Sequence, residues 1–137
     1  MAGGVSMAVR PVASGQGGVL ARVVRECYEA VRDGRVGDLL ALVDPQVVFY
    51  PVFRPGLAAY HGHDDMACLV SDMHLAHGDY TVEFGDITVQ HAALVTANVT
   101  VVAGPGRDQP PVAVESVFAF RDGLISRMES HPGGKVA

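Results

Sequence analysis

The chain has 137 residues, of which 49% are hydrophobic and 18% are charged, and its formal net charge at pH 7 is −5. This length and composition indicate one globular domain with a single buried core, and they exclude a disordered chain. The acidic balance and the lack of a Lys/Arg run argue against nucleic acid as a partner. No apolar run in the sequence approaches the roughly 20 residues of a membrane span, so no membrane association is expected.

Residues 1–17 are rich in glycine and carry one arginine. They are predicted to be a flexible leader rather than a secretion signal, because they have no long apolar block. The two cysteines, Cys27 and Cys68, are too few for a disulfide framework. Reduced thiols and a cytoplasmic location are therefore expected. The many small residues and the single lysine are typical of a high-GC bacterial genome.

A first helix is predicted over residues 18–34, because apolar residues recur there at helical spacing. These residues are Leu20, Val24, Cys27 and Val31. A short second helix follows over residues 36–43, and the alternating, β-rich stretch 46–52 comes after it. A third helix is expected from about Asp64 to His77, closed by Gly78.

Beyond the third helix the pattern changes to the two-residue period of strands. Four strands are predicted, over residues 80–90, 93–104, 111–120 and 124–130. Gly85 inside the first of them suggests a bulge that would curve the sheet. Helices on one face of an antiparallel sheet make an α+β domain. Because they cover only part of a strongly bent sheet, a pocket is expected between the two layers.

Three segments carry a resemblance to a known family: YEAVRDGRVGDLLALVDPQVVFYPV at 28–52, YHGHDD at 60–65 and VFAFRDGLISRM at 117–128. With them, about residues 19–131 resemble the SnoaL-like group of the nuclear transport factor two-like superfamily. The resemblance implies a cone-shaped barrel, in which a strongly curved, mostly antiparallel sheet is covered by three N-terminal helices. The domain would span residues 18–132 and leave a tail at 133–137. The superfamily hosts steroid isomerases, limonene-type epoxide hydrolases, polyketide cyclases, dehydratases and non-catalytic binding domains, so the fold does not fix the chemistry.

Two catalytic sets of this superfamily are not matched. Where ketosteroid isomerases carry a general-base aspartate, this chain has Tyr50. Their helix-one tyrosine falls near Cys27, with Tyr28 one place off, and their second oxyanion donor aligns with Ser116. The Arg-x-Asp pair and further Asp of limonene-type epoxide hydrolases fall at Ser116, Phe118 and Ser130. Neither named reaction is therefore assigned.

Four of the six histidines lie in or beside the third predicted helix: His61, His63, His74 and His77. The neighbouring Asp64 fits the N-cap, and Asp65 fits the first turn. A metal site is the competing interpretation, but roughly 16 Å of helical rise would separate the two histidine pairs, so no metal is expected. His77 ends an apolar stripe made by Met66, Val70 and Met73. It is either a partly buried histidine bonded to backbone, or an acid or base in the pocket.

Strand alternation predicts the lining of the pocket. Val114, Ser116, Phe118 and Phe120 share the bulkier face of their strand, and the pairing known from the superfamily adds Tyr50, Asn98, Met128 and Ser130. The expected catalytic residues are Tyr50, His77 and Asn98. The expected substrate-binding residues are Tyr28, Tyr60, Met66, Met73, Ser116, Phe118, Phe120, Met128 and Ser130.

The opposite sheet face would present Glu115, Arg127, Glu129 and His131, as solvated charges or as a homodimer interface. A one-residue slip of the last strand would instead bring Glu129 and His131 into the pocket as an acid–base pair. The leading hypothesis is a cofactor-free isomerase, cyclase or dehydratase that acts on an apolar, polyketide- or terpenoid-like molecule. The alternative is a non-catalytic domain that binds a small ligand.

Overall fold

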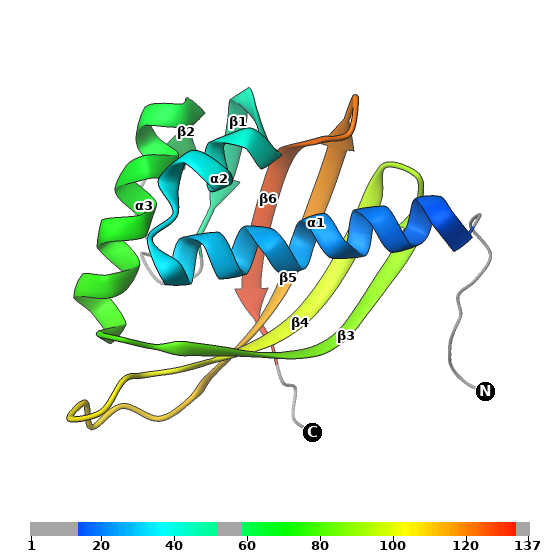
Figure 1. The fold of residues 1–137 in the computed structure, drawn as a ribbon. Helices are drawn as coiled ribbons and strands as arrows, with labels where there is room; N and C mark the ends of the chain where they lie inside the picture. The colour runs from blue at the N-terminus through cyan, green and yellow to red at the C-terminus, as the bar shows by residue number, and fades with distance from the viewer. Residues whose placement is uncertain (1–13, 52–58, 134–137) are drawn as a thin grey trace.

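The computed structural model describes residues 14–51 and 59–133. In this part of the chain, three helices lie over one face of a single curved, six-stranded sheet (Figure 1). The expected α+β class and the mostly antiparallel sheet are confirmed. The elements in chain order are α1 (Ser14–Asp33), α2 (Val36–Leu42), β1 (Val43–Tyr50), β2 (Tyr60–His61), α3 (Gly62–His77), β3 (Thr81–His91), β4 (Leu94–Val102), β5 (Val112–Arg121) and β6 (Leu124–Pro132).

The strands lie in the order β2-β1-β6-β5-β4-β3. β1 runs parallel to β6, and every other neighbouring pair is antiparallel. The pairing of β3 with β4 shifts register between Phe84 and Ile87, which confirms the bulge predicted at Gly85. A bulge increases the local twist and bend of a sheet, so this one helps β3 and β4 to curve beneath α1.

The helices follow the predicted apolar stripes with small differences at their ends. The whole stripe of α1, at Leu20, Val24, Cys27 and Val31, is buried. α1 begins at Ser14, four residues before the predicted start. The rest of the expected leader lies outside the described residues, and so does the expected tail beyond Gly133. In that described part, no helix is long and apolar enough to cross a membrane.

The prediction that Asp64 is the N-cap of the third helix is wrong. α3 already begins at Gly62, and its N-cap is His61, which has extended backbone angles. Gly62 has a φ of 78°, in the left-handed region that glycine adopts without strain, so the chain turns into the helix two residues earlier. The Asp65 carboxylate accepts a hydrogen bond from the His61 N–H at 2.8 Å, which satisfies one of the free donors of the first turn.

The short strand β2 was not predicted, and it fixes the edge of the sheet next to α3. β2 pairs antiparallel with β1, with Val48 opposite His61 and Phe49 opposite Tyr60. The rings of Phe49 and Tyr60 stack with their centroids 5.9 Å apart. Both side chains are buried, so this edge closes one side of the core.

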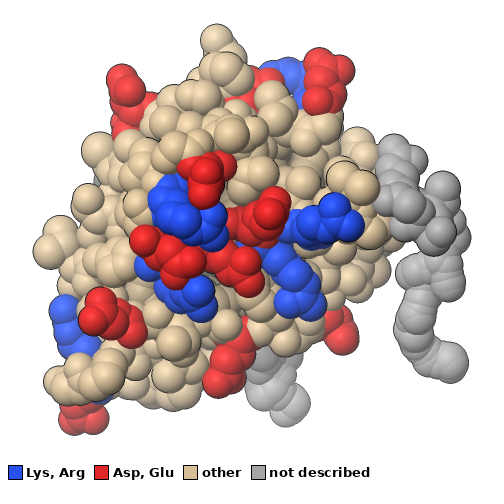
Figure 2. Space-filling view, in the orientation of Figure 1, with Lys and Arg blue, Asp and Glu red and all other residues tan. Residues whose placement is uncertain are grey.

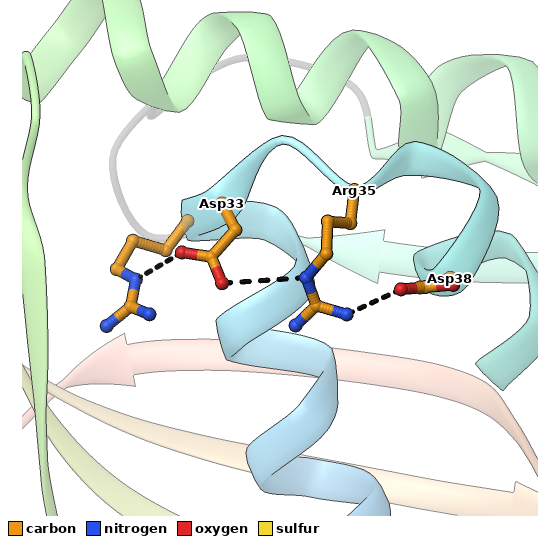
Figure 3. Close-up of polar contacts among 4 residues, drawn as sticks. Asp33, Arg35 and Asp38 are labelled. Atoms are coloured by element: carbon orange, nitrogen blue, oxygen red, sulfur yellow. Dashed lines mark hydrogen bonds and ion pairs between the residues drawn. The ribbon is translucent and has the colours of Figure 1, made fainter.

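Charged side chains of both signs mix on the helix-covered side of the molecule (Figure 2). Around the turn from α1 to α2 they form an alternating chain of ion pairs (Figure 3). Arg32 lies 2.8 Å from Asp33, Asp33 lies 3.5 Å from Arg35, and Arg35 lies 2.5 Å from Asp38. Exposed pairs of this kind contribute little stability, so packing of the apolar stripes holds the helices on the sheet.

Candidate functional site

A small pocket lies between the helices α1 and α3 and the inner face of the sheet. Its walls are mostly aliphatic and aromatic side chains, and the residues that bring a hydroxyl group to them are Tyr28, Tyr80 and Ser130. Its volume is about 40 Å³. Pockets that hold small-molecule ligands typically have about 300–1,000 Å³. A ligand must therefore displace wall side chains in order to enter.

Three hydroxyl groups meet at this pocket, and we call them the hydroxyl cluster: Tyr28, Ser116 and Ser130. The Tyr28 hydroxyl lies 2.6 Å from Ser116 Oγ, which lies 3.1 Å from Ser130 Oγ. Each hydroxyl can donate one hydrogen bond and accept others. The cluster can therefore present either a donor or an acceptor to an oxygen atom of a ligand.

The cluster is assembled by one helix and two adjacent strands. Ser116 on β5 pairs directly with Ser130 on β6, so both side chains stand side by side on the inner face. Tyr28 reaches them from α1, and its ring meets Phe84 and Phe118 edge-on at centroid distances of 5.8 and 5.9 Å. These two aromatic contacts fix the direction of the phenol and aim its hydroxyl at Ser116.

Burial controls the ionisation of the groups around the pocket. Burial raises the pKa of Tyr28 well above its ordinary value, although the hydrogen bond with Ser116 acts in the opposite direction. Burial also raises the pKa of the Cys27 thiol to about 12. A neutral Tyr28 is a hydrogen-bond donor and not a base, and a protonated Cys27 is a poor nucleophile.

The predicted placement of Tyr50 and Asn98 in the pocket is wrong. Tyr50 is 42% exposed and lies under the guanidinium of Arg127, 4.7 Å from its ring centroid. The inward position on this part of β1 belongs to Phe49. Asn98 is exposed, between buried residues on β4, so it lies on the outer face of the sheet. Neither side chain reaches the hydroxyl cluster.

His77 is buried, as predicted for the end of the apolar stripe of α3, but it does not line the pocket. Its Nδ1 lies 3.4 Å from Gln109 Oε1, and its ring meets the Tyr80 ring edge-on at 6.0 Å. The structure therefore does not bring together the three residues expected to be catalytic. One lies at the end of α3 and two on the outer sheet face.

The expected substrate-binding residues fall into three groups. Four of them line the pocket: Tyr28, Met73, Met128 and Ser130. Ser116 joins them through its hydrogen bonds, and Tyr60 lines a neighbouring groove. The remaining three are buried in the core beside the pocket: Met66, Phe118 and Phe120.

The outer sheet face is as predicted, and the last strand is not slipped. Glu129 pairs with Val117 and His131 pairs with Glu115, so these charges point away from the pocket. Glu129 forms an ion pair with Arg127 at 2.7 Å, and its other carboxylate oxygen lies 3.4 Å from His131 Nε2. The neighbouring Arg127 guanidinium lowers the pKa of Glu129 below its ordinary value.

The remaining histidines of the α3 region make separate local contacts. His63 Nε2 lies 3.1 Å from the Val43 carbonyl, and His74 Nδ1 lies 2.9 Å from the Val70 carbonyl. Within residues 14–51 and 59–133, no three His, Cys, Asp or Glu side chains lie close enough together to hold a metal ion.

One acidic residue near the pocket was not singled out in the sequence. Asp72 on α3 accepts a hydrogen bond from the Tyr60 hydroxyl at 2.6 Å, in the groove that adjoins the pocket. The partners are 12 residues apart in the chain and meet only because β2 pairs with β1. The helical pattern places Asp72 beside Met73 but gives no sign of this contact.

Comparison with known proteins is consistent with this architecture. The family model described as SnoaL-like domain matches residues 24–128. A protein from a soil-derived mobile gene cassette is similar in structure, with a TM-score of 0.72 and 18% identity over 85% of this chain and 90% of that one. The comparison with curated proteins gave no match.

The names of two further solved structures refer to an enzyme activity or to a bound compound. One is the epoxide hydrolase/cyclase-like enzyme SalBIII of pyran ring formation in salinomycin, with a TM-score of 0.69 and 17% identity over 87% of this chain and 95% of that one. The other is TerC co-crystallised with polyporic acid, with a TM-score of 0.67 and 18% identity over 82% of this chain and 89% of that one. At these identities the similarity shows a shared fold.

Proposed function

The chain belongs to the SnoaL-like domain family, and we propose that it binds a small, mostly apolar molecule through one oxygen atom held by the hydroxyl cluster. The observation that carries this proposal is the hydrogen-bonded contact of Tyr28 and Ser116 in an otherwise apolar pocket. Buried polar groups in an apolar surrounding fix the orientation of a ligand, while the apolar walls supply most of the affinity. A carbonyl or phenolic oxygen on a polyketide- or terpenoid-like skeleton fits both requirements.

Binding is favoured over acid–base catalysis by the ionisation of the pocket lining. Among the lining residues in the described part of the chain, the titratable ones are Cys27, Tyr28 and Tyr80. Burial raises the pKa of each of them. All three are therefore protonated near pH 7 and cannot remove a proton from a ligand.

A second candidate is a cofactor-independent isomerase, cyclase or hydro-lyase. The observation in its favour is the neutral Tyr28 hydroxyl, fixed by two aromatic contacts in a mostly apolar pocket. A fixed donor in such surroundings stabilises negative charge that develops on a carbonyl oxygen during reaction. The cyclase-like relative with the same fold adds support to this candidate. Formation of a product from an unsaturated ketone, lost in Tyr28→Phe, would identify catalysis.

The homodimer also stays a prediction. Arg127 and Glu129 are adjacent opposite charges on the outer sheet face. Two copies related by a two-fold axis could therefore pair these charges reciprocally. Sedimentation equilibrium tests the prediction, and a single monomeric species at high concentration would contradict it.

The binding proposal is tested by titrating para-hexylphenol into the protein in a calorimeter. Removal of one hydrogen-bonding hydroxyl that lines the pocket, by Tyr28→Phe or Ser130→Ala, is expected to weaken binding about tenfold. Tyr50→Phe removes the same atom from an exposed tyrosine on the other side of the sheet and is the matched control. It should leave the Kd unchanged. Equal Kd values for the wild-type protein and the Tyr28→Phe variant would contradict the proposal.

A further inference from the structure

The hydroxyl cluster is a linear chain whose two ends face the pocket. Ser116 is the middle member, with its Oγ 2.6 Å from the Tyr28 hydroxyl and 3.1 Å from Ser130 Oγ. Ser116 is 1% exposed and does not line the pocket, whereas Tyr28 and Ser130 do. A ligand in the pocket therefore meets the two ends of the chain and not its middle.

The protons of the three hydroxyl groups limit what the two ends offer. Each hydroxyl carries one proton, so three protons serve the two hydrogen bonds of the chain. Within the described residues, Ser116 Oγ has no acceptor other than its two neighbours in the chain. Since a buried hydroxyl that donates to nothing is costly, Ser116 donates to one neighbour and accepts from the other. One end is left with a free O–H donor, and the other end offers only lone pairs.

The acidity of the phenol sets the direction of the chain. A tyrosine side chain has an ordinary pKa of about 10, far below that of an aliphatic alcohol, so it is the stronger donor and the weaker acceptor. The 2.6 Å between Tyr28 and Ser116 is short for an O–H···O bond, as expected when the stronger donor gives its proton to the better acceptor. Tyr28 therefore donates to Ser116, and Ser116 donates to Ser130. Successive bonds of this kind polarise one another, which strengthens the last donor.

The free proton is then that of Ser130. Ser130 is half-buried on the inner face of β6, while the adjacent Glu129 and His131 point to the outer face. In the described part of the chain the Ser130 hydroxyl has no acceptor besides the cluster, so its proton is available to a ligand oxygen in the pocket. Tyr28 faces the same pocket as a neutral oxygen that has already given its proton to Ser116.

We propose that Ser130 is the residue that donates a hydrogen bond to the ligand, and that Tyr28 acts on a carbonyl ligand only through Ser116, as a positioning residue. The ligand must then carry an acceptor oxygen, and an apolar ketone is the simplest compound of this class. A phenol fits as well, because its oxygen accepts from Ser130 while its own proton goes to the Tyr28 oxygen. This inference rests on the proposed function and adds which hydroxyl selects the ligand and in which direction the proton is shared.

The first test is the infrared absorption of a bound ketone, with para-hexylacetophenone as the probe. A hydrogen bond to a carbonyl oxygen lowers its stretching frequency, and a carbon-13 label on the carbonyl separates its band from those of the protein amides. The band of the ketone bound to wild-type protein should lie below its position in hexane. Ser130→Ala should return it to the hexane position, whereas Tyr28→Phe should keep most of the shift. Loss of the shift in Tyr28→Phe, or its survival in Ser130→Ala, would overturn the proposal.

Calorimetric titration of the same ketone gives a second readout. Ser130→Ala is expected to weaken binding about tenfold. Tyr28→Phe should weaken it less than about threefold, because only the polarisation of the chain is lost. Ser126→Ala is the matched control: it makes the same change on β6, at a hydroxyl that donates to the Ala119 carbonyl and does not line the pocket. Ser130→Thr keeps the hydroxyl and should restore both the affinity and the band shift. Equal Kd values for Ser130→Ala and Ser126→Ala would contradict the proposal.

A matched ligand tests the need for an acceptor on the unchanged protein, so this readout does not depend on the folding of any variant. para-Hexyl-α-methylstyrene has a CH₂ group in place of the carbonyl oxygen and nearly the same shape. It should bind wild-type protein about tenfold more weakly than the ketone, because Ser130 then has no acceptor. Equal Kd values for ketone and alkene would overturn the proposal.

The outcomes separate this inference from the proposed function. If the shift of the bound ketone is lost in Tyr28→Phe and kept in Ser130→Ala, the hydroxyl cluster still anchors the ligand and only the role of Ser130 is overturned. If the ketone binds to wild-type protein with the frequency it has in hexane, or if neither ketone nor phenol binds, the proposed function is overturned as well.

Discussion

At the scale of single residues, the pocket depends on groups that stay neutral. Cys27 and Tyr28 are neighbours on α1, and burial raises the pKa of both side chains. A charged form of either group inside the core would lack solvation, so the folded state holds the two protons more tightly than the unfolded state does. The same burial that makes Tyr28 a hydrogen-bond donor also makes the fold sensitive to high pH.

Stability should therefore fall in alkaline solution. A raised pKa in the folded state leaves stability intact below the unfolded pKa, which is 9.0 for Cys27 and 10.0 for Tyr28. Above these values the unfolded chain loses its protons first, and each group costs about 1.4 kcal/mol of unfolding free energy per pH unit. For Cys27 this loss extends to about pH 12.

Urea denaturation at a series of pH values measures this effect. The unfolding free energy of wild-type protein should decrease above about pH 9, and Cys27→Ala should postpone the decrease to about pH 10. The exposed thiol of Cys68 provides the control, since Cys68→Ser should follow the wild-type curve. A free energy of unfolding that stays constant between about pH 9 and about pH 11 would contradict the burial of Cys27 and Tyr28 as neutral groups.

The inward residues of β5 were predictable because its bulkier side chains share one face, and those of β6 were predicted from the strand pairing of the superfamily. Ser116 lies between Glu115 and Val117, and its partner Ser130 follows the charged Glu129. The alternation expected over residues 46–52 is absent from Val47 to Tyr50, which are apolar or aromatic at every position, so the pattern contains no signal for the direction of Tyr50. Such a stretch is oriented only by its neighbours β2 and β6.

For Asn98 the local signal was correct and the family pairing was misleading. The alternation on β4 places the threonines at 96 and 100 on one face together with Asn98, and Ala97 and Val99 on the other. The structure follows this alternation, with Ala97 and Val99 buried and Asn98 exposed. The pairing of Asp72 with Tyr60 had no comparable signal, because it depends on a tertiary contact.

At the scale of elements, α3 supplies Leu69 and Met73 to the pocket wall, and its C-terminal end is tied to the loop between β4 and β5. Arg107 Nη1 donates to the Ala76 carbonyl at 3.1 Å, and Gln109 Nε2 donates to the same carbonyl at 3.1 Å. Gly78 ends the helix with a φ of 69°. A cation at the carbonyl end of a helix also interacts favourably with the helix dipole.

Loss of this contact should loosen α3. Arg107→Ala is expected to lower the unfolding free energy by about 1 kcal/mol, since it removes a charged donor from the last helical carbonyls. In a chain of this size the melting temperature should fall by about 3 °C. Arg22→Ala, at an exposed arginine of α1, is the matched control in a calorimetric melt. Equal melting temperatures for the two variants would show that the Arg107 contact adds no stability.

At the scale of the whole molecule, the helix layer and the sheet enclose an apolar core that is interrupted by the hydroxyl cluster. The overall pattern of helices followed by strands was predictable, because long periodic segments are strong signals. The location of the site was predictable only in part, because it depends on which side chains fill the space under α1 and α3. Tyr28, Ser116 and Ser130 come from three elements that meet only in the folded chain.

The central claim is that a ligand oxygen is held by the hydroxyl cluster, and a crystal structure of the complex with para-hexylphenol tests it most directly. We expect the phenol oxygen at hydrogen-bond distance from Tyr28 or Ser130, with at least one wall side chain of the pocket displaced. Density for the phenol on the outer sheet face, or in the pocket with its oxygen turned away from the hydroxyl cluster, would overturn this claim.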